Sequence, residues 1–242
     1  MRNIKLVLEY DGSKYYGWQW QPRGRTIQGE LQRSLQKLLQ ESTKVIAAGR
    51  TDSGVHALGQ VVNFKTENTL DVPSIRLGIN SYLPGDVRVL SAVQVHDTFH
   101  ARFDARSRVY RYVISKRPRA VGRQYAWYCK YLLEVAEMKR ASSHLLGSHR
   151  FTAFSRVIEE EPHYLCEVYS LCWKETNDEI EMEICANRFL HHMVRLIVGT
   201  MVEVGRGKLT PGRVQEILAS GSRKDAGSAV PPQGLFLVSV NY

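Results

Sequence analysis

The sequence predicts an α+β protein of two halves, whose strands form a central, mostly antiparallel sheet flanked by helices. Three observations support this fold class. In each half, segments with every second residue apolar, typical of strands, alternate with segments whose apolar residues recur every three or four positions, typical of helices. Of the 242 residues, 43% are hydrophobic and 24% are charged, as expected of a protein with a buried core. No stretch reads as a linker, a low-complexity tract or a coiled coil.

The first half, residues 1–104, is predicted to contain three strands and two helices. In chain order we expect a strand over 4–10, a helix over 27–38, a strand over 60–65, a short helix from 73 and a strand over 86–95. Thr26 is a suitable N-cap for the first helix, and Pro73 begins the second, which stops near Pro84-Gly85. A loop over 49–54 precedes the middle strand.

The second half, residues 105–242, repeats this theme. We expect a strand over 109–115, a helix over 135–146, strands over 165–173 and 179–186, helices over 190–204 and from 211, and a closing strand over 235–240. Thr210-Pro211 is a strong helix start, and Gly221 ends that helix. Two halves of this composition resemble ferredoxin-like or RNA-recognition-type units that share one sheet.

Charge and cysteine content narrow the class of protein further. Lysine and arginine number 33 against 24 acids, a net charge of +9, which favours a polyanionic partner, although it is also compatible with solubility alone. Four cysteines are too few for a disulfide scaffold in a chain of this length. No signal segment is visible at the start, and the longest apolar run, 196–202, is too short to span a membrane. We therefore expect a soluble, cytoplasmic protein.

The densest basic stretch opens the second half. Between residues 102 and 127, eight cations and the single acid Asp104 are interleaved with the aromatic residues Phe103, Tyr110, Tyr112, Tyr125 and Trp127. Cations for phosphates and aromatic faces for unstacked bases are the features that single-stranded or flipped-out RNA requires. The alternative is an exposed strand with solvated charges and tyrosines that only pack.

The loop over 48–57 is a candidate catalytic segment. It places Arg50 two residues before Asp52, between Gly49 and Gly54, which allow tight backbone geometry. An aspartate buried at the base of a cleft can stay ionised if an arginine lies close by, and it could then act as a nucleophile or general base. Asp52 could instead only stabilise a turn. Asp-Ser-Gly also occurs in aspartic proteases, but a second such triplet is absent, which disfavours that class.

A third candidate lies at the start of the helix predicted over 190–204. It holds Arg188, His191, His192 and Arg195. Adjacent histidines point about 100° apart on a helix, and no His-Glu-x-x-His pattern or Cys-x-x-Cys spacing is present, so a metal site is disfavoured. Arg195 would be an ordinary surface cation unless its helix faces the loop of Asp52.

Several segments, taken together, resemble the tRNA pseudouridine synthase A family. The resemblance covers essentially the whole chain in order. Its segments are Gly17-Trp18-Gln19, 26–31, 48–57 (AGRTDSGVHA), 80–86 (NSYLPGD), 99–105 (FHARFDA), Tyr110-Arg111-Tyr112, 187–199 (NRFLHHMVRLIVG), Gly234-Leu235 and 240–242.

The resemblance implies a cofactor-free homodimer that isomerises uridines at positions 38, 39 and/or 40 in the anticodon stem-loop of tRNA. It also implies the shared-sheet fold, with a catalytic cleft between the halves. Asp52 takes the place of the family's catalytic aspartate, and Tyr110 that of the tyrosine against the target base. Arg195 takes the place of the basic residue that pairs with that aspartate, and Arg50 that of the arginine that displaces the uridine.

Two points of chemistry and recognition stay open at the level of sequence. The carboxylate could attack C1′ of the sugar or C6 of the base, or abstract a sugar proton. Cys166 stands where the family pattern leads us to expect an arginine, and Glu159-Glu160-Glu161 makes the preceding loop acidic, which puts that loop's tRNA contacts in doubt. The alternative to an enzyme is a non-catalytic RNA-binding or tRNA-folding module with the same basic, aromatic surface.

Overall fold

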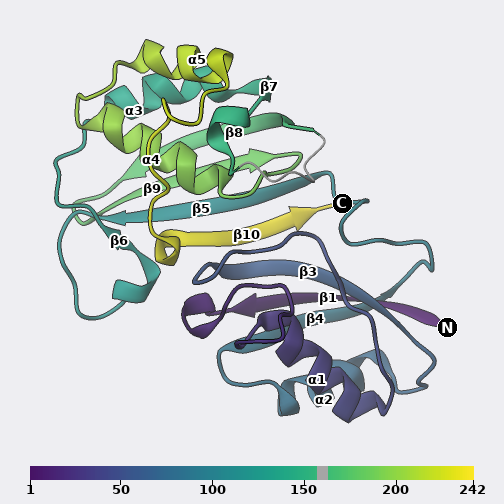
Figure 1. Cartoon of the computed structure of the whole chain (residues 1–242). Coiled ribbons are helices and arrows are strands. Elements are labelled where there is room, and N and C mark those ends of the chain that lie inside the picture. Colours follow the sequence, from purple (N-terminus) through teal and green to yellow (C-terminus); the bar gives the residue numbers. More distant parts are fainter. Residues whose placement is uncertain (157–162) are drawn as a thin grey trace. The chain divides into compact units, whose positions relative to one another are not determined.

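The computed structural model describes residues 1–156 and 163–242 and shows a mixed α/β protein with a central multi-stranded sheet (Figure 1). The described residues contain five α-helices. Two compact units are present, Met1–Arg106 together with Phe236–Tyr242, and Ser107–Leu235. No α-helix in the described ranges has the length and apolar character needed to cross a membrane.

The strands of the first unit are ordered β4 (Val87–Val95), β1 (Arg2–Tyr10), β3 (His56–Thr66) and β10 (Leu235–Asn241). β1 is antiparallel to both β3 and β4. β10 runs parallel to β3, with Phe236 opposite His56. The two-residue strand β2 (Ile46–Ala47) pairs antiparallel with β3 and leads into the loop over 48–55.

Helices α1 (Ile27–Leu39) and α2 (Val72–Tyr82) pack against each other, and α2 packs against β4. Alternation along β1 buries Ile4, Leu6 and Leu8 completely, which forms the sheet's contribution to the core. The predicted cap of α1 is confirmed, because Oγ1 of Thr26 accepts a hydrogen bond from the backbone N–H of Gly29 at 3.3 Å.

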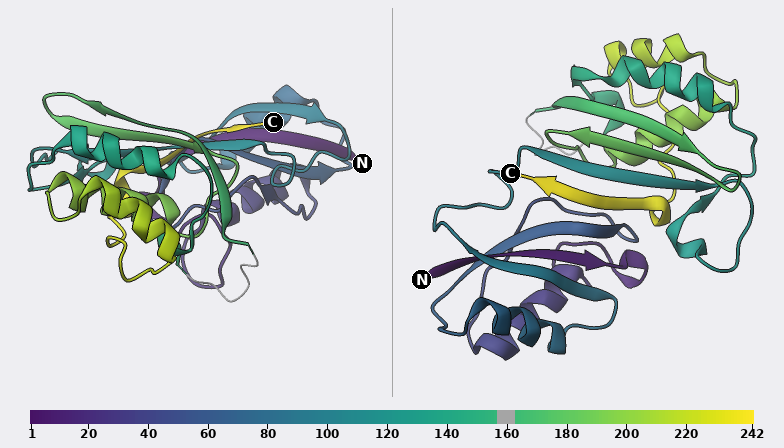
Figure 2. Two further views of the ribbon diagram at one scale, coloured as in Figure 1. Left: turned by 90° about the horizontal axis from the view of Figure 1, so that it is seen from above. Right: turned by 180° about the vertical axis from the view of Figure 1, so that it is seen from behind.

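The second unit has the strand order β5 (Ser107–Ser115), β9 (Glu179–Ala186), β8 (Leu165–Glu175) and β7 (Gly147–Arg150), and these neighbours pair antiparallel. The two-residue strand β6 (Trp127–Tyr128) runs parallel to β5. Helices α3 (Val135–Ser142), α4 (Met193–Gly205) and α5 (Pro211–Ser220) lie on one face of this sheet (Figures 1 and 2). Short 3₁₀ turns in the two units occupy Gly12–Lys14, Arg123–Tyr125, Ser143–Leu145, Thr152–Phe154 and Pro232–Gly234.

Every predicted helix and strand is present, and three of them differ by three residues or more at one end. The helix predicted over 190–204 begins only at Met193, because His192 adopts a left-handed backbone with φ 64°. The helix predicted over 135–146 ends at Ser142 and continues as the 3₁₀ turn Ser143–Leu145. The strand predicted over 60–65 begins earlier, at His56. The acidic residues 159–161 lie outside the described residues.

Candidate functional site

Asp52 lies in the loop between β2 and β3, at the first position of a tight turn. The backbone N–H of Val55 donates to the carbonyl oxygen of Asp52 at 3.2 Å, and Gly54 has φ +76°, as such a turn requires. The start of the loop is held by Gln60, whose Nε2 donates to the carbonyl oxygen of Gly49 at 2.9 Å. Asp52 is half-buried, whereas Arg50 is exposed.

Thr51, the residue before Asp52, is anchored to the interior of the first unit. Thr51 is buried, and its Oγ1 lies 2.8 Å from the phenol oxygen of Tyr10 on β1. Its carbonyl oxygen accepts a hydrogen bond from the N–H of Trp18 at 3.0 Å. Burial raises the pKa of Tyr10 to about 12, although hydrogen bonds with Thr51 and Gln60 oppose the shift, so the phenol stays uncharged at neutral pH.

Two glycines allow the segment after β1 to lie directly against this loop. A Cβ atom at Gly12 would be 2.0 Å from the carbonyl oxygen of Val55, and one at Gly17 would be 2.6 Å from that of Thr51. Gly17 also has φ +87°, which L side chains rarely adopt. Because backbone packs against backbone near both ends of the loop, at Thr51 and at Val55, the loop of Asp52 has little freedom to move.

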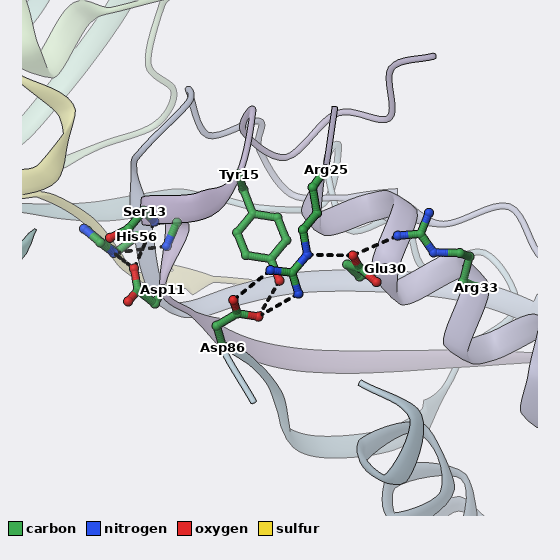
Figure 3. A network of polar contacts seen from close by, with 9 residues as sticks. Asp11, Ser13, Tyr15, Arg25, Glu30, Arg33, His56 and Asp86 are labelled. Carbon is green, nitrogen blue, oxygen red and sulfur yellow. Dashed lines mark hydrogen bonds and ion pairs between the residues drawn. The ribbon is translucent and has the colours of Figure 1, made fainter. Parts of the chain in front are cut away.

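A polar network holds the segment after β1 in place (Figure 3). The guanidinium of Arg25 donates to both carboxylate oxygens of Asp86, at 3.0 and 3.2 Å, and through Nε to Glu30 at 2.8 Å. The phenol of Tyr15 donates to Asp86 at 2.5 Å and lies under the Arg25 guanidinium. Burial, then the bond to Asp86, raises the pKa of Tyr15 well above its usual value. The network ties this segment to α1 and to the residue that precedes β4.

Tyr110 belongs to the second unit, where it lies on β5 opposite Ile184 of β9. The side chain is largely buried and makes an edge-to-face contact with Phe189, with ring centroids 4.9 Å apart. Its neighbour Tyr112 is fully buried and donates its hydroxyl to the carbonyl oxygen of Pro231 at 2.7 Å. Tyr112 is therefore a packing residue, as the structural alternative for this stretch predicted.

Arg195, also in the second unit, lies half-buried on the first turn of α4. Its Nε donates to the carbonyl oxygen of Val230 at 2.7 Å, and the N–H of Val230 donates to the carbonyl oxygen of Arg195. One turn further, Gly199 allows this segment to approach α4, since a Cβ there would be 1.9 Å from the carbonyl oxygen of Ser228. The segment before β10 thus sets the orientation of the Arg195 guanidinium.

Part of the basic stretch over 102–127 is paired with acids of the same unit. Three of its members form ion pairs with acids at the β8–β9 hairpin: Lys116 with Glu175 at 2.5 Å, Arg117 with Asp178 at 2.9 Å and Arg119 with Glu179 at 2.6 Å. Since those pairs neutralise charge within the unit, they contribute little to attracting a polyanion. Among the aromatic members, Phe103 is 75% exposed and Tyr125 is 40% exposed.

The structure thus distributes the predicted site residues over both units. Arg50 and Asp52 share one loop of the first unit, and Tyr110 and Arg195 lie on β5 and α4 of the second. Reasoning from sequence missed the supporting residues Tyr10, Gly12 and Arg25. The signal for Gly12 was its position two residues after the end of a predicted strand, but nothing in the sequence indicates which loop it faces.

Comparisons with known proteins show which family of proteins the chain belongs to. A family model described as tRNA pseudouridine synthase matches residues 6–104 and 141–242. These ranges include Arg50, Asp52 and Arg195, and Tyr110 lies between them. The chain belongs to the tRNA pseudouridine synthase family, which is a family of isomerases.

Full-length relatives narrow the comparison further. The chain is 43% identical over 244 residues to "tRNA pseudouridine synthase A" of Thermoanaerobacter sp. (strain X514), with all of both chains covered. It is 43% identical, again with complete coverage of both, to the protein of that name from Caldicellulosiruptor bescii. Identity to the Bacillus pumilus protein of that name is 41%, with 99% of this chain and 98% of the relative covered.

Proposed function

We propose that this enzyme isomerises uridine to pseudouridine at positions 38, 39 and/or 40 in the anticodon stem-loop of tRNA, with Asp52 as the essential catalytic carboxylate. Full-length similarity to relatives named tRNA pseudouridine synthase A supports the substrate class. Since tRNA is a cytoplasmic RNA, the proposed compartment is the cytoplasm. The proposed assembly is a homodimer of chains, each built from two ferredoxin-like halves.

The proposed reaction is an isomerisation, so its atoms balance within the substrate. The bond from C1′ to N1 of the uracil breaks, the base turns, and a bond from C1′ to C5 forms. The proton on C5 is lost to a base or to water, and N1 gains one. Asp52 serves as the nucleophile, at C1′ or C6, or as the base that takes a sugar proton.

The other site residues have distinct roles in this proposal. The uridine must leave the stack, at an energetic penalty of a few kcal/mol that an aromatic contact and a cation in the vacated space can offset. Tyr110 stacks on the extruded base, and Arg50 occupies the space it leaves. Arg195 pairs with Asp52, which orients the carboxylate. The proposal requires both units to present these side chains to one uridine.

The observation that carries the proposal is the anchoring of the residues around Asp52. Catalysis by one carboxylate needs that group fixed relative to the substrate, because misplacement by about 1 Å can reduce a rate about 100-fold. Thr51 is held from Tyr10 and Trp18, and Gly54 and Ser53 are held from the carbonyl oxygen of Tyr15, at 3.3 and 3.1 Å. A merely solvated surface turn needs no such support.

The test measures tritium release from unmodified tRNA transcripts that carry uridine labelled at C5. Asp52→Asn is expected to abolish release while tRNA binding survives. Asp97→Asn, the same chemical change at an exposed turn of the first unit, is the matched control and should release tritium at the wild-type rate. Transcripts with cytidine at positions 38, 39 and 40 should release none from this site.

Two results would contradict the proposal. Undiminished release by Asp52→Asn would remove the carboxylate from the mechanism. A wild-type protein that binds tRNA without releasing tritium would support the non-catalytic RNA-binding module instead.

A further inference from the structure

The segment over 12–26, between β1 and α1, carries two exposed aromatic side chains. Tyr16 is 63% exposed and Trp20 is 55% exposed. Single exposed apolar residues are common, whereas exposed apolar groups that form one patch mark interaction sites. Tyr15 and Trp18 of the same segment are buried, at 2% and 3% exposure, so the exposure of Tyr16 and Trp20 does not reflect a loose loop.

Tyr16 and Trp20 are each held by a hydrogen bond from their own backbone N–H, and the ring of each lies near a glycine. The N–H of Tyr16 donates to the carbonyl oxygen of Arg25 at 2.9 Å, and its ring lies against Gly24, where a Cβ would be 2.5 Å from ring carbon Cδ2. The N–H of Trp20 donates to Oε1 of Gln28 at 2.9 Å. A Cβ at Gly29 would be 3.3 Å from Cδ1 of the indole. Each ring is therefore positioned while much of its surface remains open.

The segment is in direct contact with the loop of Asp52. The carbonyl oxygen of Tyr15 accepts hydrogen bonds from the N–H of Gly54 at 3.3 Å and from Oγ of Ser53 at 3.1 Å. On the other side of Tyr16, a Cβ at Gly17 would be 3.0 Å from the carbonyl carbon of Asp52. Tyr16 thus lies between two residues that touch the candidate catalytic loop.

The charges of this segment favour an anionic occupant. Lys14 and Arg23 are exposed, and neither forms an ion pair with any described residue. The neighbouring acids Glu30 and Asp86 are balanced by two arginines, since Arg25 binds both of them and Arg33 also binds Glu30, so these acids do not offset Lys14 and Arg23. Open aromatic surfaces beside unpaired cations are the combination that binds single-stranded nucleic acid.

We propose that Tyr16 and Trp20 form a stacking surface for unpaired nucleotides that flank the target uridine in the anticodon loop of tRNA. This inference rests on the proposed function, because the proximity to Asp52 places the surface beside the reacting base. The role proposed for Tyr16 and Trp20 is substrate recognition and is separate from the chemistry at Asp52. Lys14 and Arg23 attract phosphates, and the two rings hold bases that have left the helical stack.

The experiment measures the Kd of a tRNA transcript for the full-length protein by filter binding. Tyr16→Leu and Trp20→Leu remove the aromatic ring, and each is expected to weaken binding about ten-fold. Tyr16→Phe keeps the ring and should bind as the wild type does. Tyr82→Leu, at an exposed tyrosine that ends α2 and is 48% exposed, is the matched control and should leave the Kd unchanged.

A second readout separates stacking from a structural role. A transcript with 2-aminopurine beside the target uridine is expected to lose fluorescence on binding wild type and to lose less with Tyr16→Leu. The inference is overturned if both leucine variants bind within about two-fold of wild type. It is also overturned if Tyr82→Leu weakens binding equally. Neither the Kd nor the fluorescence change requires turnover. If the wild type released no tritium, the proposed function would be refuted, but the binding measurements would still test the stacking surface.

Discussion

The phenol oxygen of Tyr10 and the hydroxyl oxygen of Thr51 lie 2.8 Å apart in the interior of the first unit, although the two residues are 41 positions apart in the sequence. This hydrogen bond joins strand β1 to the loop of Asp52. Because Thr51 is the residue before Asp52, Tyr10 is a positioning residue for the Asp52 carboxylate.

Replacing Tyr10 by phenylalanine tests that role. The change removes one buried hydrogen bond and leaves Oγ1 of Thr51 without its partner, which should lower the free energy of unfolding by about 1 to 3 kcal/mol. It should also reduce the rate of tritium release, with little change in tRNA binding. Urea unfolding and the release assay measure the two effects. Tyr242→Phe is the matched control, since it removes a tyrosine hydrogen bond to Ala101 in the same unit. Equal loss of rate in both variants would argue against a specific role for Tyr10.

Stability at high pH should depend on Tyr10. Its pKa is about 12 in the folded protein, against 10.0 ordinarily, because of burial. Below pH 10.0 both states keep the proton and the contribution of Tyr10 is constant. Between the two values the unfolded chain has lost the proton and the folded protein has not, so stability falls as pH rises, by about 2 to 3 kcal/mol in total.

Urea unfolding at several alkaline pH values measures this dependence. Tyr10→Phe should lose stability less steeply than wild type above pH 10.0. Tyr15 and Tyr112 also have raised pKa values because of burial, but both remain in the variant, so the difference between the two proteins isolates Tyr10. Identical slopes would show that the phenol of Tyr10 is not protected from ionisation.

Gly17→Ala should reduce the rate of tritium release because it displaces the loop of Asp52. The new Cβ would be 2.6 Å from the carbonyl oxygen of Thr51, so the loop of Asp52 must move to accommodate it. The positive φ alone costs about 1 kcal/mol for alanine. Gly207→Ala is the matched control, because Gly207 has φ +73° but no atom within 4 Å of the added Cβ. We expect both variants to carry the cost of the positive φ, and only Gly17→Ala to carry the clash and to lose tritium release.

Gly199→Ala should destabilise the second unit severely. A Cβ there would lie 1.9 Å from the carbonyl oxygen of Ser228, a backbone atom, so the segment that binds Arg195 through Val230 must separate from α4. A loss of several kcal/mol in unfolding free energy, about 3 or more, is typical of such overpacking with broken hydrogen bonds. Gly212→Ala, in the first turn of α5 with open space around it, should be neutral or stabilising by up to about 1 kcal/mol. Thermal unfolding distinguishes these outcomes.

Elements with local signals were predicted well from sequence. α1 begins after Thr26 and α5 begins at Pro211 and ends at Gly221, which has φ 65°, because caps and breakers act within one turn of the helix. The start of α4 was misplaced since the apolar periodicity continues through Leu190, while the backbone at His192 turns left-handed. Strands β2, β6 and β7 were not predicted, because two to four residues are too few to show a period.

The amino-acid sequence by itself determined the helices and long strands, the family, and which side chains are candidates for the chemistry. Only the tertiary structure decided that β10 runs parallel to β3, that Tyr10, Gly12 and Gly17 hold the loop of Asp52, and that Tyr16 stays exposed beside it. The physical reason is how far apart in the sequence the interacting residues lie. Periodicity, caps and turns depend on residues a few positions apart, whereas these contacts join residues tens of positions apart, whose pairing is set by packing.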